Sequence, residues 1–288
     1  MGKFGLEAQI LEETEMLMEH LEEEGIVDPS TTLTNFTSNN IMRMMFSQRW
    51  QYGDADFEVF TNHLEILHTN GPDLIILMLK DLVPMSRHLP YVKQVAKEVS
   101  KAVGHIRNFF WHIIEKQIAE KDSMESDNFT EAYLQTHETM DEKEINNLVD
   151  LCQEMFLAGA EPTSVTMNYV IVHLLNNPSW QEELFHEIKT AFQGEVPSME
   201  DLEKLPKLEA TIQETLRLNP NGPLIPRATA HATKVRNYVV PANCQVWVNA
   251  YHINYDPITF PDPTSFSPQR WLRQDGTFRR GCPYSKYQ

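Results

Sequence analysis

Residues 141–176 read DEKEINNLVDLCQEMFLAGAEPTSVTMNYVIVHLLN, and the rest of the chain is interpreted around this stretch. Acidic residues crowd its first turn, where the positive end of a helix dipole favours them. Apolar residues cover most faces from Leu148 onward. The pattern predicts one long helix. Because its apolar residues reach nearly all round, we expect this helix to be buried at the centre of the fold.

The middle of the predicted helix contains the stretch AGAEPTS at residues 158–164. Three small residues, Ala158, Gly159 and Ala160, precede a proline. Pro162 has no amide hydrogen to offer the carbonyl of Ala158, so we expect the helix to open locally and this carbonyl to be able to hold a water. Close helix packing is the simpler explanation for the small residues, and both explanations can hold together.

Amphipathic patterns predict further helices on both sides of this stretch. They cover residues 6–24, 31–46, 54–67, 91–120, 179–192 and 207–218. The first is expected to end at Gly25, and an acidic break follows the fourth at residues 121–127. After Pro220 the sequence becomes rich in β-branched residues and proline, and residues 235–240 and 245–248 are predicted to form two short paired strands.

The fold class predicted from these elements is mainly α with a small β portion late in the chain. No internal repeat and no domain boundary is visible. Residues 1–288 are therefore predicted to belong to a single, undivided domain.

The composition excludes several classes of protein. A net charge of −17 and a pI near 5.0 would repel phosphate backbones, so nucleic acid is not an expected partner. No run reaches the roughly 18 apolar residues that a membrane span needs. Three cysteines, Cys152, Cys244 and Cys282, fit no zinc or disulfide spacing, which favours a reducing compartment.

Two charged motifs follow the long helix. Glu214 and Arg217 lie three residues apart on a predicted helix and can pair, although such a pair is usually a solvated surface contact of little value. Further along, FSPQRW at residues 266–271 places Arg270 beside Trp271. Taken alone, Arg270 would be an ordinary surface arginine next to a packed tryptophan.

In this order and spacing, AGAEPTS, the Glu214-x-x-Arg217 pair and Pro268-x-Arg270 resemble three motifs of the cytochrome P-450 family. These are the oxygen-binding motif of the central helix, the Glu-x-x-Arg pair and the meander motif. The resemblance covers essentially the whole chain, and RNYVVP with FPDP, at residues 236–241 and 260–263, is similar to the animal microsomal branch. It implies the P-450 fold.

The same resemblance implies a buried network of Glu214, Arg217 and Arg270. Two guanidinium groups around one carboxylate need further acceptors, and we expect these to be backbone carbonyls. The resemblance also implies that Arg227 contacts a haem propionate, since a guanidinium suits a carboxylate. A loop arginine is the ordinary alternative for Arg227.

The resemblance implies roles on the long helix as well. Ala158 and Gly159 would lie where the helix passes closest to the haem and would leave room for dioxygen and substrate. Glu161 would relay protons to the bound oxygen, the alternative being an exposed helical glutamate. The family's oxygen-binding threonine is replaced here by Pro162, and Thr163 is the candidate to substitute for it.

The haem iron of this family is bound by a cysteine in a glycine-rich loop that the resemblance places beyond Gln288. Cys282 lacks the glycines and the arginine of that loop, and we interpret it as unrelated. Cys152 and Cys244 are expected to be small buried or half-buried residues. No metal ligand is therefore predicted in the chain, and the haem-cysteine loop and the N-terminal helices of the fold are expected to be absent.

The leading hypothesis is a fragment of a haem-dependent monooxygenase that inserts one oxygen atom into an apolar xenobiotic, steroid or fatty acid. Electrons would come from NADPH through NADPH-cytochrome reductase. The full-length relative would be anchored on the cytoplasmic face of the endoplasmic reticulum membrane, whereas this chain would lack the anchor and be inactive alone. Two alternatives stay open: a non-catalytic helical remnant, or an isomerase or dehydratase of the same family, which Pro162 would suit.

Overall fold

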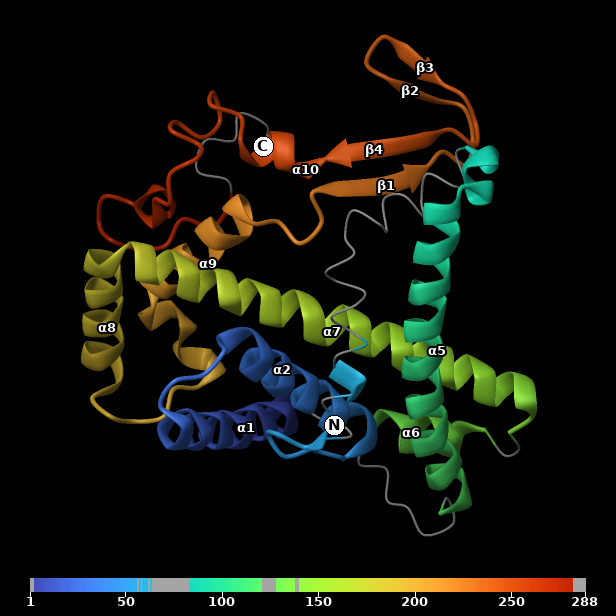
Figure 1. Cartoon of the computed structure of the whole chain (residues 1–288). Coiled ribbons are helices and arrows are strands. Elements are labelled where there is room, and N and C mark those ends of the chain that lie inside the picture. The colour runs from blue at the N-terminus through green and yellow to red at the C-terminus, as the bar shows by residue number, and fades with distance from the viewer. Residues whose placement is uncertain are drawn as a thin grey trace. The chain divides into compact units, whose positions relative to one another are not determined.

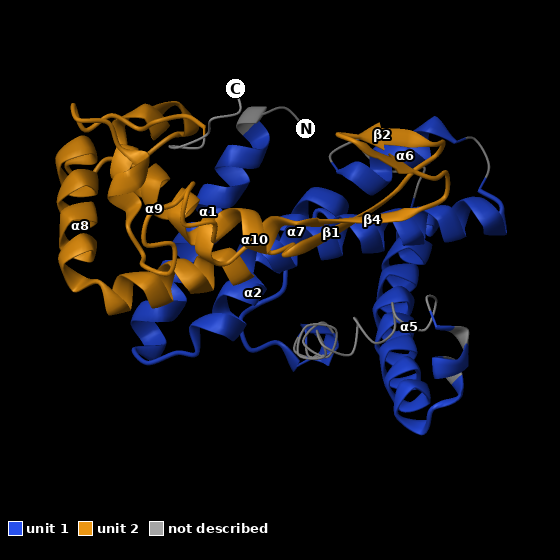
Figure 2. Ribbon diagram, turned by 90° about the horizontal axis from the view of Figure 1, so that it is seen from above, with its two compact units in different colours: residues 1–164 blue, residues 165–288 orange. Residues whose placement is uncertain are grey.

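The structure is a computed structural model, and it describes residues 3–55, 57, 59–61, 63, 83–120, 128–137 and 140–281. The chain divides into two compact units, residues 1–164 and 165–288 (Figures 1 and 2). Helices build the first unit, and the second combines helices with two small sheets. The predicted class, mainly α with a small β portion, is confirmed. The assignment of the whole chain to one domain stays a prediction.

The helices described in the first unit follow the predicted pattern closely. They are α1 (Lys3–Glu24), α2 (Pro29–Phe46), the 3-10 helix η1 (Pro84–His88), α5 (Pro90–Ala119), α6 (Phe129–Thr136) and the first part of α7 (Glu142–Asn176). Gly25 ends α1 with a positive φ of 67°, as expected. The short α6 was not predicted. The predicted helix at 54–67 lies largely outside the described residues, as does the break at 121–127.

The long helix α7 begins where its acidic first turn predicts. The amide of Glu144 donates to Asp141 Oδ1 at 2.8 Å, and the amide of Asp141 donates to Glu144 Oε2 at 3.1 Å. This reciprocal pair satisfies amides that the helix itself leaves without acceptors. The helix continues through Pro162, so the expected local opening does not interrupt it.

Burial of α7 is confined to one stripe. The buried residues are Leu148, Val149, Cys152, Phe156, Ala160 and Ser164. Most of them recur every fourth position and therefore share one face. Apolar residues on other faces are exposed, including Val172 and Leu175 at 48% and 70%. The expectation that this helix is buried at the centre of the fold is confirmed for the stripe from Leu148 to Ala160, which lies in the core of the first unit, and is wrong for its other faces.

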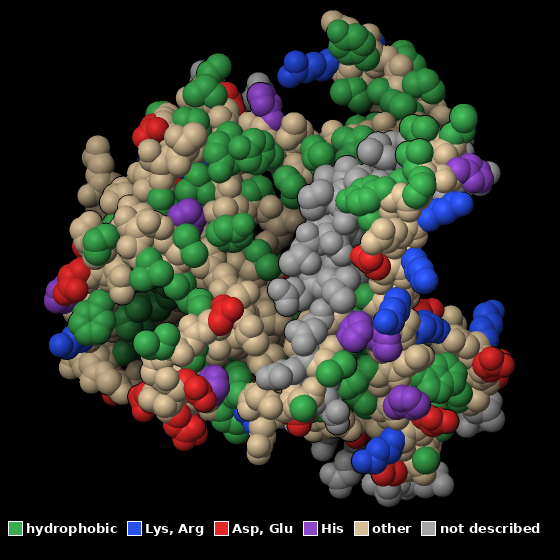
Figure 3. Space-filling view, viewed as in Figure 1, with side chains coloured by type: hydrophobic (Ala, Val, Ile, Leu, Met, Phe, Trp, Pro, Cys, Tyr) green, Lys and Arg blue, Asp and Glu red, His purple; other side chains and the backbone are tan. Residues whose placement is uncertain are grey.

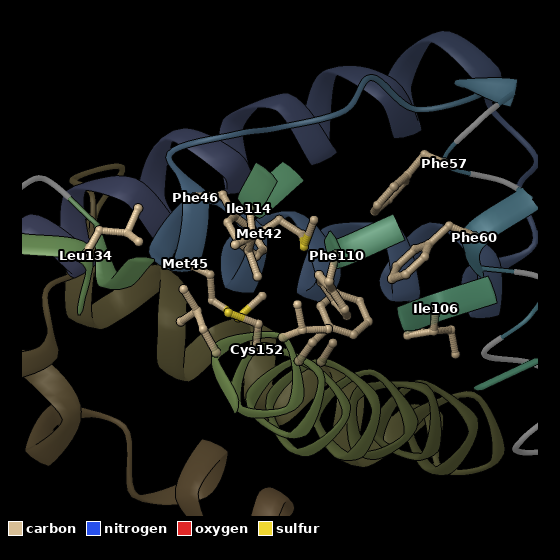
Figure 4. Packing of buried hydrophobic residues seen from close by; sticks show 14 residues of the cluster. Met42, Met45, Phe46, Phe57, Phe60, Ile106, Phe110, Ile114, Leu134 and Cys152 are labelled. Carbon is tan, nitrogen blue, oxygen red and sulfur yellow. The ribbon is translucent and has the colours of Figure 1, made fainter. Parts of the chain in front are cut away.

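The core of the first unit forms where α2, α5, α6 and α7 meet (Figure 4). Its rings pack in contact, with centroid separations of 5.8 Å for Phe46 and Phe110 and 5.6 Å for Phe110 and Phe156. Each such side chain stabilises the fold by about 1.5–3 kcal/mol through burial alone. The face of α7 that carries Ala160 is held by this core.

The second unit contains the remaining helices. They are the end of α7, α8 (Pro178–Phe192), the 3-10 helix η3 (Met199–Lys204), α9 (Pro206–Leu218), α10 (Ala250–Asn254) and the 3-10 helix η4 (Pro268–Trp271). Proline occupies the first position of α8 and α9, where its missing amide hydrogen is not needed. Glu187 accepts from the amides of Lys207 and Leu208 at 2.9 and 3.1 Å and so caps α9.

The two sheets each have two antiparallel strands. Strand β1 (Leu224–Ala228) pairs with β4 (Gln245–Asn249), and β2 (Thr233–Val235) pairs with β3 (Tyr238–Val240). The predicted pairing of residues 235–240 with residues 245–248 is therefore wrong. The first segment contains a turn, with Arg236 at a φ of 52°, and folds back as a hairpin. The true partner of β4 contains Pro226, which argued against a strand in the sequence.

Candidate functional site

The carboxylate of Glu214 on α9 is fully buried and accepts five hydrogen bonds. Arg217 donates Nε to Oε2 and Nη2 to Oε1, both at 2.9 Å. Arg270 Nε and the Ser267 amide donate to Oε1, each at 3.0 Å. Trp271 Nε1 donates to Oε2 at 2.9 Å. The structure thus brings together the three side chains that the sequence motifs place in one network.

Arg217 uses every N–H of its guanidinium group. Its Nη1 donates to the carbonyls of Asn254 and Pro263 at 2.9 and 2.7 Å, and Nη2 also donates to the carbonyl of Ser265 at 3.3 Å. Arg270 donates to the carbonyls of Pro261 and Asp262 at 3.1 and 3.3 Å. The expectation that backbone carbonyls supply the further acceptors agrees with these contacts.

Sequence reasoning missed two donors to Glu214. Trp271 was expected only to pack, and the amide of Ser267 was not considered. The signal available was that a buried indole N–H needs a partner. Trp271 is 7% exposed and also packs with Phe260 and Ala210 in the small core of the second unit.

Burial alone would raise the pKa of Glu214. Hydrogen bonds from Arg217, Ser267 and Trp271, together with the charge of Arg217, outweigh it and hold the pKa below its ordinary value. Glu214 therefore stays ionised, and both of its oxygens are occupied by donors. A carboxylate in this state is suited to fixing α9 to the loop at residues 254–271, and not to exchanging protons.

A hollow of 540 Å³ lies beside the network. Its lining includes Leu216, Ile253 and Phe278, with Gln213 and Arg280 among the polar groups. No set of three or more His, Cys, Asp or Glu side chains that could hold a metal ion occurs among the described residues.

The small residues of α7 have different surroundings. Ala158 is exposed and Ala160 is buried in the core. A Cβ on Gly159 would lie 2.7 Å from Ile41 Cδ1 on α2, closer than carbon atoms can pack. Close helix packing therefore accounts for Gly159. Of the two residues proposed to leave room for dioxygen, the surroundings of Ala158 alone are open.

Glu161 is half-buried, and Thr163 is exposed one turn beyond Gly159. Thr163 Oγ1 donates to the carbonyl of Gly159 at 2.9 Å. The hydroxyl is thus held against the helix one residue away from the carbonyl of Ala158, which Pro162 leaves without its usual amide donor. The structure brings these groups within one turn of helix.

Arg227 lies on β1, opposite Val246 of β4. Its side chain is exposed, and Nη1 donates to the carbonyl of Pro226 at 2.8 Å. Arg227 belongs to a strand, so the alternative interpretation of it as a loop arginine is wrong.

Cys152 does not fit a thiolate ligand for iron. The Cys152 thiol is buried with the Thr130 hydroxyl 3.9 Å away, and burial raises its pKa to about 12. A ligand cysteine needs the opposite shift. Cys244 is half-buried and its thiol donates to the carbonyl of Gln245 at 3.7 Å, while Cys282 lies outside the described residues.

A second buried carboxylate, Glu13 on α1, was not singled out in the sequence. It accepts from Asn39 Nδ2 at 3.0 Å, Arg49 Nε at 2.8 Å and the Tyr52 hydroxyl at 3.2 Å. Burial and the charge of Glu13 raise the pKa of Tyr52 above its ordinary range. The cluster ties α1 to α2 and to the segment after it, and it has no spacing signature in the sequence.

Comparison with known proteins shows the family of the chain. This chain, with its buried Glu214–Arg217 pair and Arg270, matches the sequence model of the cytochrome P450 family over residues 2–285. It belongs to this family. It is 29% identical to cytochrome P450 2C44 of Mus musculus over 97% of this chain and 58% of that protein. It is 32% identical to (S)-N-methylcoclaurine 3'-hydroxylase isozyme 1 of Eschscholzia californica over 86% of this chain and 50% of that protein. The chain thus spans little more than half the length of these relatives.

Proposed function

We propose that this chain is the central part of a haem-dependent monooxygenase that oxidises an apolar small molecule. Haem, when bound, would supply the oxygen chemistry, with electrons delivered from NADPH through a reductase. Membership of the family supports the reaction class. The proposal extends to a position at the endoplasmic reticulum membrane. In the described residues, no helix is both long and apolar enough to cross a bilayer.

The observation that carries the proposal is the polar turn of α7 around Pro162. Ala158 is exposed, and its own carbonyl lacks an amide donor because Pro162 has no N–H. Glu161 and Thr163 lie within the same turn. In this proposal Ala158 leaves space for substrate, while Glu161 and the Thr163 hydroxyl hold and pass protons. Arg227 offers an exposed guanidinium to a propionate carboxylate.

The test is the ratio of product formed to NADPH consumed. It uses a completed protein in which the flanking segments of cytochrome P450 2C44 are joined to this chain. Thr163→Val, which keeps the shape and removes the hydroxyl, is expected to lower the ratio severalfold and to divert electrons to hydrogen peroxide. Thr166→Val, three residues further along α7, is the matched control and should leave the ratio unchanged. An unaltered ratio for Thr163→Val would remove Thr163 from the proton path.

Pro162 itself favours a second candidate function. A proline in place of the oxygen-binding threonine suits an isomerase or dehydratase that rearranges an already oxygenated substrate and consumes no NADPH. Turnover of a hydroperoxide by the completed protein without NADPH would favour this candidate. Strict dependence on NADPH would favour the monooxygenase.

A further inference from the structure

Two histidines from distant parts of the first unit lie against each other. The rings of His63 and His105 have centroids 4.4 Å apart, and their planes are tilted by 40°. His63 is half-buried, and His105, on α5, is exposed. Figure 3 shows histidine side chains at the surface over α5, among lysines and arginines. Neither ring has a part in the proposed function.

The pair is held in place by the core next to it. One helical turn away, the ring of Phe60 stacks on Phe109 with 4.2 Å between their centroids. Phe60 lies three residues before His63 and Phe109 four residues after His105, so both ring contacts join the same two helical segments. Phe60 is 4% exposed and lies near Phe110, with 5.8 Å between the centroids (Figure 4). The two histidines are therefore brought together by packing that does not depend on them.

One hydrogen bond determines which nitrogen of His63 keeps a lone pair. Its Nδ1 lies 2.6 Å from the carbonyl oxygen of Val59, one turn earlier. A carbonyl oxygen can only accept, so Nδ1 carries the hydrogen and Nε2 of the neutral ring keeps its lone pair. Histidines that bind metal ions commonly have this arrangement, in which the second ring nitrogen donates to a backbone carbonyl and fixes the ring. His63 is thus oriented to act as a ligand through Nε2.

The separation of the two rings favours particular ions. With a metal–nitrogen distance of about 2.0–2.1 Å, two imidazoles at about 90° around one ion have centroids about 4.5 Å apart, and two at the tetrahedral angle about 5.2 Å apart. The observed 4.4 Å agrees with the smaller angle. Square-planar and tetragonal nitrogen sites are typical of Cu²⁺ and Ni²⁺. We propose that His63 and His105 bind one Cu²⁺ or Ni²⁺ ion at adjacent coordination positions, with water in the remaining positions.

A cation fits this pair better than an anion does. A phosphate or a carboxylate would need N–H donors, whereas Nε2 of His63 presents a lone pair. Lys101, one turn before His105 on α5, is exposed, and its flexible side chain can turn into solvent. Two protein ligands make a smaller set than the groups of three or more, none of which occurs among the described residues. The inference is independent of the proposed function, because ion binding needs neither haem nor turnover.

The test is calorimetric titration of the chain with nickel chloride at neutral pH. His63→Gln and His105→Gln each remove one ligand. Loss of an outer partner of a metal ligand costs about 10–100-fold in affinity, so loss of a ligand itself should cost at least as much. The matched control is His112→Gln, because His112 is exposed on the same helix two turns further on, and it should leave the affinity unchanged. An equal loss in this control, or no loss in the two ligand variants, would overturn the proposal.

A second measurement counts the ligands. Electron paramagnetic resonance of Cu²⁺ bound to the chain should show splitting from two imidazole nitrogens, and from one in each ligand variant. A signal from one imidazole in the unaltered chain would exclude a shared site. Ni²⁺ should also raise the midpoint of thermal unfolding, because an ion that joins α5 to the segment carrying His63 binds the folded form alone. His105→Gln should lose this rise, and a rise that persisted in it would assign the ion to other residues.

Discussion

At the scale of single residues, Glu214 is the position on which the second unit most depends. Among the described residues, its carboxylate is the only negatively charged group that accepts hydrogen bonds from Arg217 and Arg270, whose side chains are 2% and 6% exposed. The remaining positive charge is distributed over backbone carbonyls. Removing the carboxylate would leave two buried guanidinium groups without this negatively charged partner.

Glu214→Ala is therefore expected to destabilise the fold by roughly 3–5 kcal/mol, measured by urea unfolding at pH 7 and followed by circular dichroism. Glu214→Gln should lose most of the same stability while keeping the shape. Since the pKa of Glu214 is lowered in the folded state, its contribution is fully present above the ordinary glutamate value of about 4.3 and is lost as the pH falls through the folded pKa. The stability gap to Glu214→Ala should close over that acidic range.

The control is Glu203→Ala, because Glu203 pairs with Arg280 at 3.4 Å while both side chains are more than four-fifths exposed. Its unfolding midpoint should match that of the unaltered chain. A midpoint for Glu214→Ala equal to that of the control would mean that the network contributes no stability.

The resemblance to the P-450 family implied which charged side chains meet, whereas the residues alone favoured ordinary surface pairs. It could not predict Trp271 and the Ser267 amide as donors. A backbone amide carries no residue identity, and a tryptophan beside an arginine is explained equally well by packing. The Glu13 cluster was not predicted for a different reason: its partners come from separate segments and share no spacing pattern.

At the scale of elements, the contact between α7 and α2 depends on the missing side chain of Gly159. Gly159→Ala gains helix propensity but drives its Cβ into Ile41, and overpacking of this kind costs about 1–3 kcal/mol. We expect a net loss of stability. Ile41→Val removes the Cδ1 atom at 2.7 Å and should restore much of it in the double variant.

The measurement is a double-mutant cycle on urea unfolding. A favourable coupling between Gly159→Ala and Ile41→Val is expected, because one substitution relieves the clash created by the other. Additive effects would indicate that Ile41 does not limit the space at Gly159. Ala158→Ser, at the exposed neighbouring position, serves as the control and should show no coupling to Ile41→Val.

The hydrophobic periodicity of the sequence predicts the helices well but does not predict how the strands pair. The helices α5, α8 and α9 begin within a residue of their predicted starts, because a proline precedes an amphipathic run in each. The strands were mispaired because pairing in a sheet depends on turns and on distant partners. Arg236 takes the left-handed turn position without glycine, and β1 forms despite Pro226, so neither showed the usual sequence signal.

At the scale of the whole molecule, the net charge of −17 makes the like charges of the folded chain repel one another. This repulsion acts over a distance set by the Debye length, about 30 Å at 0.01 M salt and about 8 Å at physiological ionic strength.

Because the 41 acidic residues outnumber the 24 basic ones, their mutual repulsion should destabilise the folded chain most at low salt. The midpoint of thermal unfolding is therefore expected to rise as sodium chloride is raised from about 0.01 M to about 0.15 M, because screening shortens the range of the repulsion. Glu214→Ala should show the same rise, since the Glu214 carboxylate and its arginine partners are buried and are screened much less than the surface charges. Circular dichroism across a salt series measures this. A midpoint that falls steadily from the lowest salt upward would contradict the expectation, since it would mean that favourable surface pairs outweigh the repulsion among the acidic residues.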